Sequence, residues 1–303
     1  SGGPNVVLKQ LLTKQHAENV SAVALSPDGK LAASGTFEEV CLWETGGRDG
    51  RRHQVDGYAL AFAPDSSRLA VGSNRRGLVY EVFSGSQLAA LEPFGNSVEG
   101  VAFSKDGSLL ALASHDGGVW VVPARPMDVH RRILTRQWFT LQKFCLGNWV
   151  NAVAFHPRAE RLAAGCRDGT VRVWDPWDAR QLLLVEHPDR WPVSVAYSPD
   201  GLVLAAGFSD GAVGLWWNLD GSQAGWLEGH ADWVRALAFL SNDLLATGSH
   251  DGRLRIWQWQ SGAVVYESMP HAKEPVYALA VEKEVLLTGG WDRTARLFRC
   301  ELG

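Results

Sequence analysis

The sequence has few cysteines, no long apolar run and no excess of charge of either sign. Its cysteines, Cys41, Cys145, Cys166 and Cys300, lie far apart, a spacing that suggests neither a zinc site nor a disulfide framework. No apolar run approaches the roughly 18 residues that span a bilayer, and no charged-then-apolar leader opens the chain. The 29 Lys plus Arg against 33 Asp plus Glu give a formal charge of −4, which provides no general attraction to nucleic acid or acidic membranes. We therefore expect an intracellular, cytoplasmic protein with no membrane partner, and a nucleic-acid partner is unlikely on charge alone.

Helical periodicity is also absent, and an internal repeat takes its place. The clearest unit is WVNAVAFHPRAERLAAGCRDGTVRVWD at 149–175, which recurs as WVRALAFLSNDLLATGSHDGRLRIW at 233–257. Each unit has two apolar segments and a third that ends in Trp. Seven copies fill the chain when they are aligned on the small residue that closes the second segment: Gly35, Gly72, Ala113, Gly165, Gly207, Gly248 and Gly289.

Short turn motifs separate the apolar segments of each copy. Ser26-Pro27-Asp28-Gly29 and Ser198-Pro199-Asp200-Gly201 follow the first segment, where Pro presets the φ of a turn and Gly accepts positive φ. An Asp-Gly pair, a strong hairpin signal, follows the second segment at 116–117, 168–169, 210–211 and 251–252. Each copy therefore predicts hairpin-connected strands a, b and c, and a fourth strand d leads to the next copy.

Small sheets that are apolar on both faces bury those faces only by packing against each other in a ring. We therefore predict an all-β fold, a seven-bladed β-propeller of four-stranded antiparallel blades in a single domain, 1–303. The approximate blades are 13–55, 56–94, 95–147, 148–188, 189–228, 229–269 and 270–303. Strand c of the last copy ends at Phe298, so an N-terminal strand at 6–12 is expected to close the ring and cover the exposed edge. The start Ser1-Gly2-Gly3, without methionine, suggests a fragment of a longer polypeptide.

Gly229-His230 and Trp174-Asp175 resemble the WD-repeat family, whose mark is Gly-His before strand a, Asp in the bc turn and Trp-Asp closing strand c. The resemblance implies a hydrogen-bonded network within each blade. Only the sixth copy is complete, with His230, Thr247 or Ser249, Asp251 and Trp257. Partial counterparts elsewhere are Asp168, Trp174, Asp210, Trp216 and Asp292. The resemblance also implies a scaffold or sensor module, similar to repeats appended to bacterial or fungal signalling NTPases, kinases and proteases.

Trp, Tyr and Arg gather on one face of the expected ring. The da and bc loops share this face, which we call the top, and the ab and cd loops share the bottom. Because these residue types are enriched in binding hot spots, we predict that a protein or peptide binds there. The predicted contact residues are Trp149, Trp191, Trp233, Arg235, Tyr277, Trp291 and Tyr58. The alternative is that the Trp residues merely cover the blades beneath them.

Catalysis is not expected, and neither is a metal or cofactor. The inner strands offer alanines instead of a ring of ligands, and no nucleophile elbow, phosphate-binding loop or His-Glu-x-x-His is present. A non-catalytic interaction scaffold or sensor is therefore the favoured function. The alternative is a module that recognises nucleic acid or a small molecule through top-face Arg and Trp within a multidomain signalling protein. A basic insertion at 123–147 is interpreted as a solvated outer strand, with docking of an acidic partner as its alternative.

Overall fold

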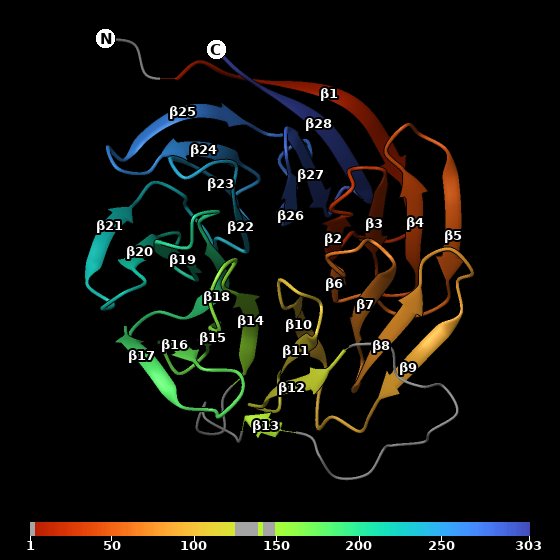
Figure 1. Cartoon of the computed structure of the whole chain (residues 1–303). Coiled ribbons are helices and arrows are strands. Elements are labelled where there is room, and N and C mark those ends of the chain that lie inside the picture. The colour runs from red at the N-terminus through yellow and green to blue at the C-terminus, as the bar shows by residue number, and fades with distance from the viewer. Residues whose placement is uncertain (1–3, 125–138, 142–148) are drawn as a thin grey trace.

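Seven four-stranded antiparallel sheets stand around a central axis in the computed structural model (Figure 1). The structure describes residues 4–124, 139–141 and 149–303, with the backbone alone for 139–141. These residues form strands and turns without a helix, so the predicted all-β propeller is confirmed. In the described ranges, accordingly, no helix could cross a membrane.

The chain forms the blades in sequence order, with the first strand of each blade nearest the axis (Figure 1). Blade 1 contains β2 (Ala22–Leu25), β3 (Leu31–Gly35), β4 (Val40–Glu44) and β5 (Asp49–His53). Blade 2 contains β6 (Ala59–Phe62), β7 (Arg68–Ser73), β8 (Arg76–Glu81) and β9 (Gln87–Leu91). Blade 3 contains β10 (Val98–Phe103), β11 (Leu109–Ser114), β12 (Val119–Pro123) and β13 (Phe139–Leu141). Blade 4 contains β14 (Val150–Phe155), β15 (Leu162–Cys166), β16 (Thr170–Trp174) and β17 (Gln181–Glu186).

The remaining three blades complete the ring. Blade 5 contains β18 (Pro192–Tyr197), β19 (Val203–Phe208), β20 (Val213–Trp217) and β21 (Gln223–Leu227). Blade 6 contains β22 (Ala236–Phe239), β23 (Leu244–Gly248), β24 (Leu254–Gln258) and β25 (Ala263–Ser268). Blade 7 contains β26 (Val276–Glu282), β27 (Val285–Gly290), β28 (Thr294–Leu302) and, from the other end of the chain, β1 (Val6–Gln15).

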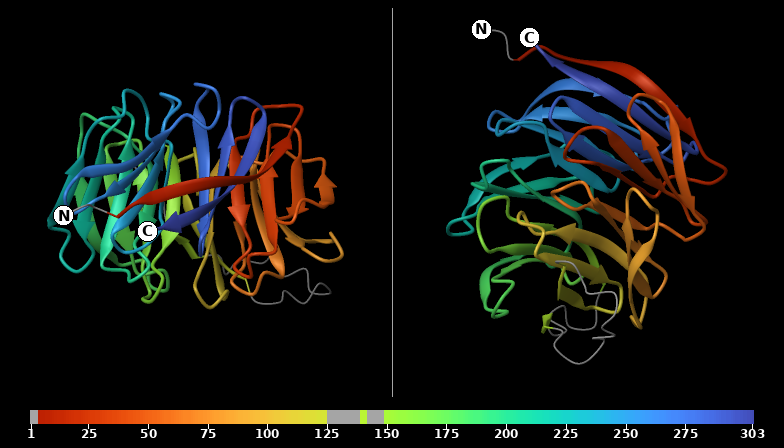
Figure 2. Two further views of the ribbon diagram at one scale, coloured as in Figure 1. Left: turned by 90° about the horizontal axis from the view of Figure 1, so that it is seen from above. Right: turned by 45° about the vertical axis from the view of Figure 1, so that its right-hand side comes forward.

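The ring closes through the N-terminal strand, as the sequence predicted. β1 pairs antiparallel with β28, from Val6 opposite Leu302 to Gln15 opposite Thr294. Figure 2 shows β1 as the outermost strand of this blade, and the backbone N–H of Gly303 donates a hydrogen bond of 2.8 Å to the Asn5 carbonyl oxygen just before β1. The pairing supplies the fourth strand of blade 7 and covers the edge that β28 would otherwise expose.

The hydrophobic core is divided among the seven junctions between blades. One cluster of buried side chains fills each junction, so each sheet is covered on both faces. The repeated glycine at the end of strand b reflects this close packing. A Cβ at Gly35 would lie 2.5 Å from the carbonyl oxygen of Gly57, and one at Gly207 would lie 2.5 Å from that of Val234, each in the next blade. These positions therefore have no room for a larger residue.

The structure corrects one expectation of the sequence analysis, and a second expectation concerns residues that are mostly outside the described ranges. The cysteine spacing suggested no disulfide framework, but Cys166 is disulfide-bonded, whereas Cys41 and Cys300 are free and buried. Cysteine spacing missed this bond because disulfides depend on distance in the fold and not along the chain. Most of the basic insertion at 123–147 lies outside the described residues.

Candidate functional site

A pocket of about 190 Å³ opens at the centre of the top face. All of the predicted contact residues except Trp291 line this pocket, and Trp291 stacks on Tyr277 with ring centroids 5.4 Å apart. The sequence analysis did not select the other lining residues, which are Ser21, Phe37, Glu99, His115, Asn151, Arg167 and Val193. We call this cavity the top pocket.

β-Bulges direct several side chains toward the mouth of the top pocket. The register of strand a shifts between Val98 and Gly100, and the same shift recurs in β14, β18 and β26. A bulge inserts one residue that has no partner on the neighbouring strand and turns its side chain. The skipped residues are Glu99, Asn151, Val193 and Tyr277, and all four line the top pocket.

A cation held between two indole rings forms one wall of the top pocket. The Arg167 guanidinium lies 4.2 Å from the ring centroid of Trp149 and 4.4 Å from that of Trp191. His115 also stacks on Trp149, with 4.3 Å between the ring centroids and 12° between the ring planes. Burial lowers the pKa of His115, so this ring is neutral near neutral pH. Cation–π contacts of this kind hold both indoles in fixed positions.

The stacking continues around the ring into blades 6 and 7. Trp191 meets Trp233 edge to face at 6.3 Å, and Trp233 stacks on His250 at 5.6 Å. His250 in turn lies 5.5 Å from Tyr277 and 5.7 Å from Trp291. The top of blades 4 to 7 is therefore one connected layer of aromatic rings, with Trp149 still 40% exposed.

An ion pair across the ring forms the floor of the top pocket. Arg235 reaches from blade 6 toward Glu99 in blade 3, with 3.5 Å between Nη2 and Oε2. Arg235 also donates a hydrogen bond of 3.0 Å to the carbonyl oxygen of Val193 and lies 4.9 Å from the ring centroid of Tyr277. Its side chain is 13% exposed, so this arginine supports the pocket from below more than it faces solvent.

The central channel below this floor is lined mainly by small and apolar side chains. Ala59, Ala152, Ala236 and Ala278 contribute to it, with Val and Leu residues between them. Among the described residues that line the channel, the ionisable ones are Tyr58, Glu99, Arg235 and Tyr277, which belong to the top pocket. The channel walls therefore do not provide the converging carboxylates or imidazoles that a catalytic or metal centre requires.

The four network residues of blade 6 lie together. His230 Nδ1 is 2.9 Å from Asp251 Oδ2, and His230 Nε2 is 2.8 Å from Thr247 Oγ1. Trp257 Nε1 donates to the same Thr247 hydroxyl at 2.8 Å. Ser249 does not take part, because its hydroxyl donates to the Asp232 carbonyl oxygen instead.

The electrostatics of this network favour the ionised form of Asp251. Burial alone would raise the pKa of its carboxyl group. The hydrogen bond and charge of His230, together with the N–H groups of Arg253 and Ala231, more than offset burial and lower the pKa to about 2.

Blades 7 and 1 contain related networks that the sequence analysis missed. His271 contacts Asp292 at 2.7 Å and Thr288 Oγ1 at 2.8 Å, with Phe298 in the place of the Trp. The sequence places His271 one residue farther from strand a than His230 lies. The intervening chain absorbs this extra residue because Ala272 and Lys273 both adopt positive φ, at 51° and 77°.

In blade 1 the network contains a serine and lacks the turn Asp. His16 Nε2 lies 2.9 Å from Ser34 Oγ, which also accepts a hydrogen bond of 3.2 Å from Trp43 Nε1. The networks of blades 1, 6 and 7 share one sequence signal, a hydroxyl residue directly before the glycine that closes strand b. That position holds Ser34, Thr247 and Thr288 in these blades, and Val71, Leu112, Ala164 and Ala206 in the other four.

The remaining network positions have other partners. Asp168 accepts hydrogen bonds from the backbone N–H and hydroxyl of Thr170 and pairs with Arg172 at 3.2 Å. Asp210 pairs with Arg190 at 3.2 Å. Trp174 and Trp216 are buried at the ends of their strands. Asp168 and Asp210 thus make local contacts close to their own turns.

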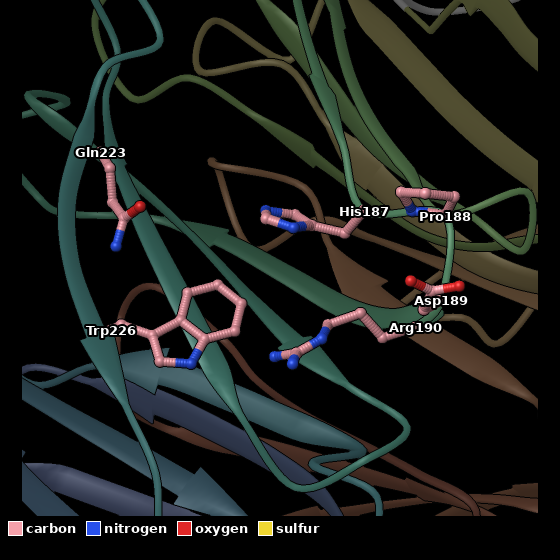
Figure 3. Close-up of a pocket in the computed structure, with 6 residues that line it drawn as sticks. All are labelled: His187, Pro188, Asp189, Arg190, Gln223 and Trp226. Carbon is pink, nitrogen blue, oxygen red and sulfur yellow. The ribbon is translucent and has the colours of Figure 1, made fainter.

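A second cavity, of about 340 Å³, lies beside the outer strand of blade 5 (Figure 3). His187 and Arg190 point toward Trp226, and the Arg190 guanidinium lies 4.9 Å from its ring centroid. His187 occupies the network position of this blade, but Ala206 provides no hydroxyl, and His187 Nε2 is buried without a hydrogen-bond partner. This cavity contains none of the predicted contact residues.

One model of a known protein family matches the sequence of this chain. The sequence profile described as "WD domain, G-beta repeat" matches residues 8–44, 85–121, 139–175, 180–216 and 221–258, more than half of the chain. The chain belongs to the WD-repeat family. The two WD repeats without a match are the second, which lacks both the turn Asp and the Trp, and the seventh, which has Phe298 for Trp. Propellers of this family are generally non-catalytic platforms for protein interaction.

Similar WD-repeat proteins match only part of this chain. It is 29% identical over 119 residues to the intraflagellar transport protein 122 homolog of Danio rerio, covering 39% of this chain and 9% of that protein. It is 33% identical over 125 residues to a probable cytosolic iron-sulfur protein assembly protein 1 of Mycosarcoma maydis, covering 41% and 26%. It is 31% identical over 118 residues to the target of rapamycin complex subunit wat1 of Schizosaccharomyces pombe, covering 38% and 34%. The match thus spans at most about a third of these relatives.

Proposed function

We propose that this propeller is a non-catalytic scaffold or sensor that binds a protein or peptide in the top pocket. The observation that carries the proposal is the connected aromatic layer around that pocket. Buried aromatic and arginine anchors contribute most of the binding energy in protein interfaces. The layer is held in place by its own stacking before a partner arrives, so little conformational entropy is lost on binding. The relatives named for intraflagellar transport and for cytosolic iron-sulfur protein assembly, and the one named as a target of rapamycin complex subunit, support an interaction role in general terms.

The charge of the top pocket favours a partner with an acidic group. Among the described residues, no carboxylate pairs with Arg167, whereas Arg235 is neutralised by Glu99. An unpaired guanidinium between two indoles presents its free N–H groups to the pocket. We therefore expect the partner to place a carboxylate on Arg167 and apolar or aromatic side chains on the neighbouring rings.

The test compares two tryptophan variants by the partner protein that each of them retains in a capture experiment. The top variant carries Trp149→Ala, Trp191→Ala and Trp233→Ala. The matched control carries Trp177→Ala and Trp217→Ala, which remove indoles that are 49% and 42% exposed at the cd turns of the bottom face. Both variants are first shown to melt within a few degrees of the unsubstituted chain.

The proposal expects one protein to be retained by the unsubstituted chain and by the control variant, and to be lost by the top variant. Retention by the top variant would refute the site. Recognition of nucleic acid or a small molecule through Arg167 remains the alternative function. It would appear as binding that falls steeply with salt in the absence of a protein partner. An intracellular location and a signalling role also stay predictions.

A further inference from the structure

Three potential metal ligands meet where the closing strand joins blade 1. His16 directly follows β1, Glu39 precedes β4, and Cys41 is the second residue of β4. Their donor atoms, His16 Nδ1, a carboxylate oxygen of Glu39 and Cys41 Sγ, all lie within 4.8 Å of one another. The sequence analysis expected no zinc site because the cysteines lie far apart in the sequence, and it did not consider Cys41 together with His16 and Glu39.

The local structure directs all three donors to one point. Glu39 and Cys41 share a face of the strand because alternate residues point to the same side. Cys41 is 2% exposed, and the His16 side chain is fully buried. His16 Nδ1 has no hydrogen-bond partner, although its ring is fixed through Nε2 by Ser34 Oγ at 2.9 Å. A buried ring nitrogen without a partner is costly, so this orientation calls for a ligand.

We infer that His16, Glu39 and Cys41 form a zinc-binding site, with water as the fourth ligand. Tetrahedral zinc with bonds of about 2.0–2.3 Å places its ligand atoms roughly 3.3–3.8 Å apart. The distance from His16 Nδ1 to Glu39 Oε1 is already 3.9 Å. A thiolate with an imidazole selects zinc over magnesium or calcium, which prefer oxygen ligands alone.

The residues around the site suit this role. A metal-bound histidine usually donates its other ring N–H to a neighbouring acceptor. Ser34 Oγ can accept this hydrogen bond from Nε2–H of His16. Arg52 lies 3.3 Å from each carboxylate oxygen of Glu39 and orients it at the surface, where Glu39 is 12% exposed and gives access to the ion. The other nearby cation, Lys14, is paired with Asp49. On binding, the Cys41 thiol loses its proton to solvent as the Zn–S bond forms, and the metal ties the end of β1 to blade 1.

Cobalt titration of the whole chain tests the site. The protein is stripped of metal, kept free of oxygen without a reductant so that the disulfide of Cys166 stays intact, and titrated with Co²⁺. The charge-transfer band of Co²⁺ bound to a thiolate reports a cysteine ligand. Cys41→Ser removes the proposed sulfur donor. Cys300→Ser is the matched control, because Cys300 is also a free, buried cysteine among the residues that the structure describes. Glu39→Gln is a second variant that retains the cysteine and the shape of the side chain.

The inference expects one Co²⁺ per chain with a thiolate band that Zn²⁺ bleaches. The band should persist in Cys300→Ser, disappear in Cys41→Ser and require at least about tenfold more Co²⁺ in Glu39→Gln. Zn²⁺ should also raise the melting temperature of the unsubstituted chain and leave that of Cys41→Ser unchanged. A missing thiolate band, a band that survives Cys41→Ser, or unchanged affinity in Glu39→Gln would overturn the inference.

Discussion

Replacing Thr247 by Val removes one hydroxyl that two buried rings share. Thr247 Oγ1 lies 2.8 Å from His230 Nε2 and 2.8 Å from Trp257 Nε1, and Thr247 has no exposed surface. Valine has nearly the same shape, so the substitution opens no cavity but leaves both ring nitrogens unpaired. Each buried polar group left unpaired costs about 1–3 kcal/mol. We expect Thr247→Val to lower the free energy of unfolding by about 2–6 kcal/mol.

Thermal unfolding measures this loss. An unfolding entropy of about 2.1 cal/mol/K per residue gives roughly 0.6 kcal/mol per kelvin for a chain of this size, so the melting temperature should fall by about 3–10 °C. Thr13→Val is the matched control on β1, because the Thr13 hydroxyl accepts only an exposed hydrogen bond from Gln10. That substitution should change the free energy of unfolding by no more than about 0.5 kcal/mol. A Thr247→Val shift no larger than that of Thr13→Val would refute the reasoning.

Three other substitutions or deletions test different parts of the fold. The pKa of Asp251 in the folded protein is about 2, below the usual 3.8, so the stability that its ionised form contributes is complete above about pH 4 and is lost as the pH falls toward 2. Asp251→Asn should therefore abolish the loss of stability between about pH 4 and pH 2 in an acid unfolding curve. Ala206→Ser gives His187 Nε2 a hydrogen-bond partner and should raise the free energy of unfolding, measured by urea titration, by about 0.5–1.5 kcal/mol. An unchanged urea midpoint would mean that the new hydroxyl does not reach the His187 ring. Deleting residues 1–15 exposes the edge of β28 and should cause aggregation in light scattering, and a stable monomer would show that the ring does not need β1.

The propeller could be predicted from the sequence because its signals are local and repeated. Gly29 and Gly201 adopt φ of 77° and 78° in the Ser-Pro-Asp-Gly turns, as a turn glycine should. Closure by the N-terminal run followed from counting strands in the last copy. The contact residues were placed near one another because they occupy three repeated top-face positions of the blades, and equivalent positions of neighbouring blades are adjacent in a ring.

Features that depend on distances between blades could not be predicted. The position of Arg167 between Trp149 and Trp191 requires the spacing of blades 4 and 5, which no single copy encodes. The bulge that turns Glu99 toward Arg235 breaks the period of two on which strand patterns depend. The network of blade 7 was missed because its histidine lies one residue out of register.

The central claim, that a partner occupies the top pocket, is tested most directly by site-specific photo-crosslinking in the source cells. A photoreactive phenylalanine analogue replaces Phe37, which lines the top pocket and is 50% exposed. In a separate variant it replaces Phe83, which is 78% exposed in the cd turn of blade 2 on the bottom face. We expect a defined protein crosslink at position 37, lost when Arg167→Ala is added, and no such crosslink at position 83. The same partner at both positions, at position 83 alone, or at neither would contradict the account.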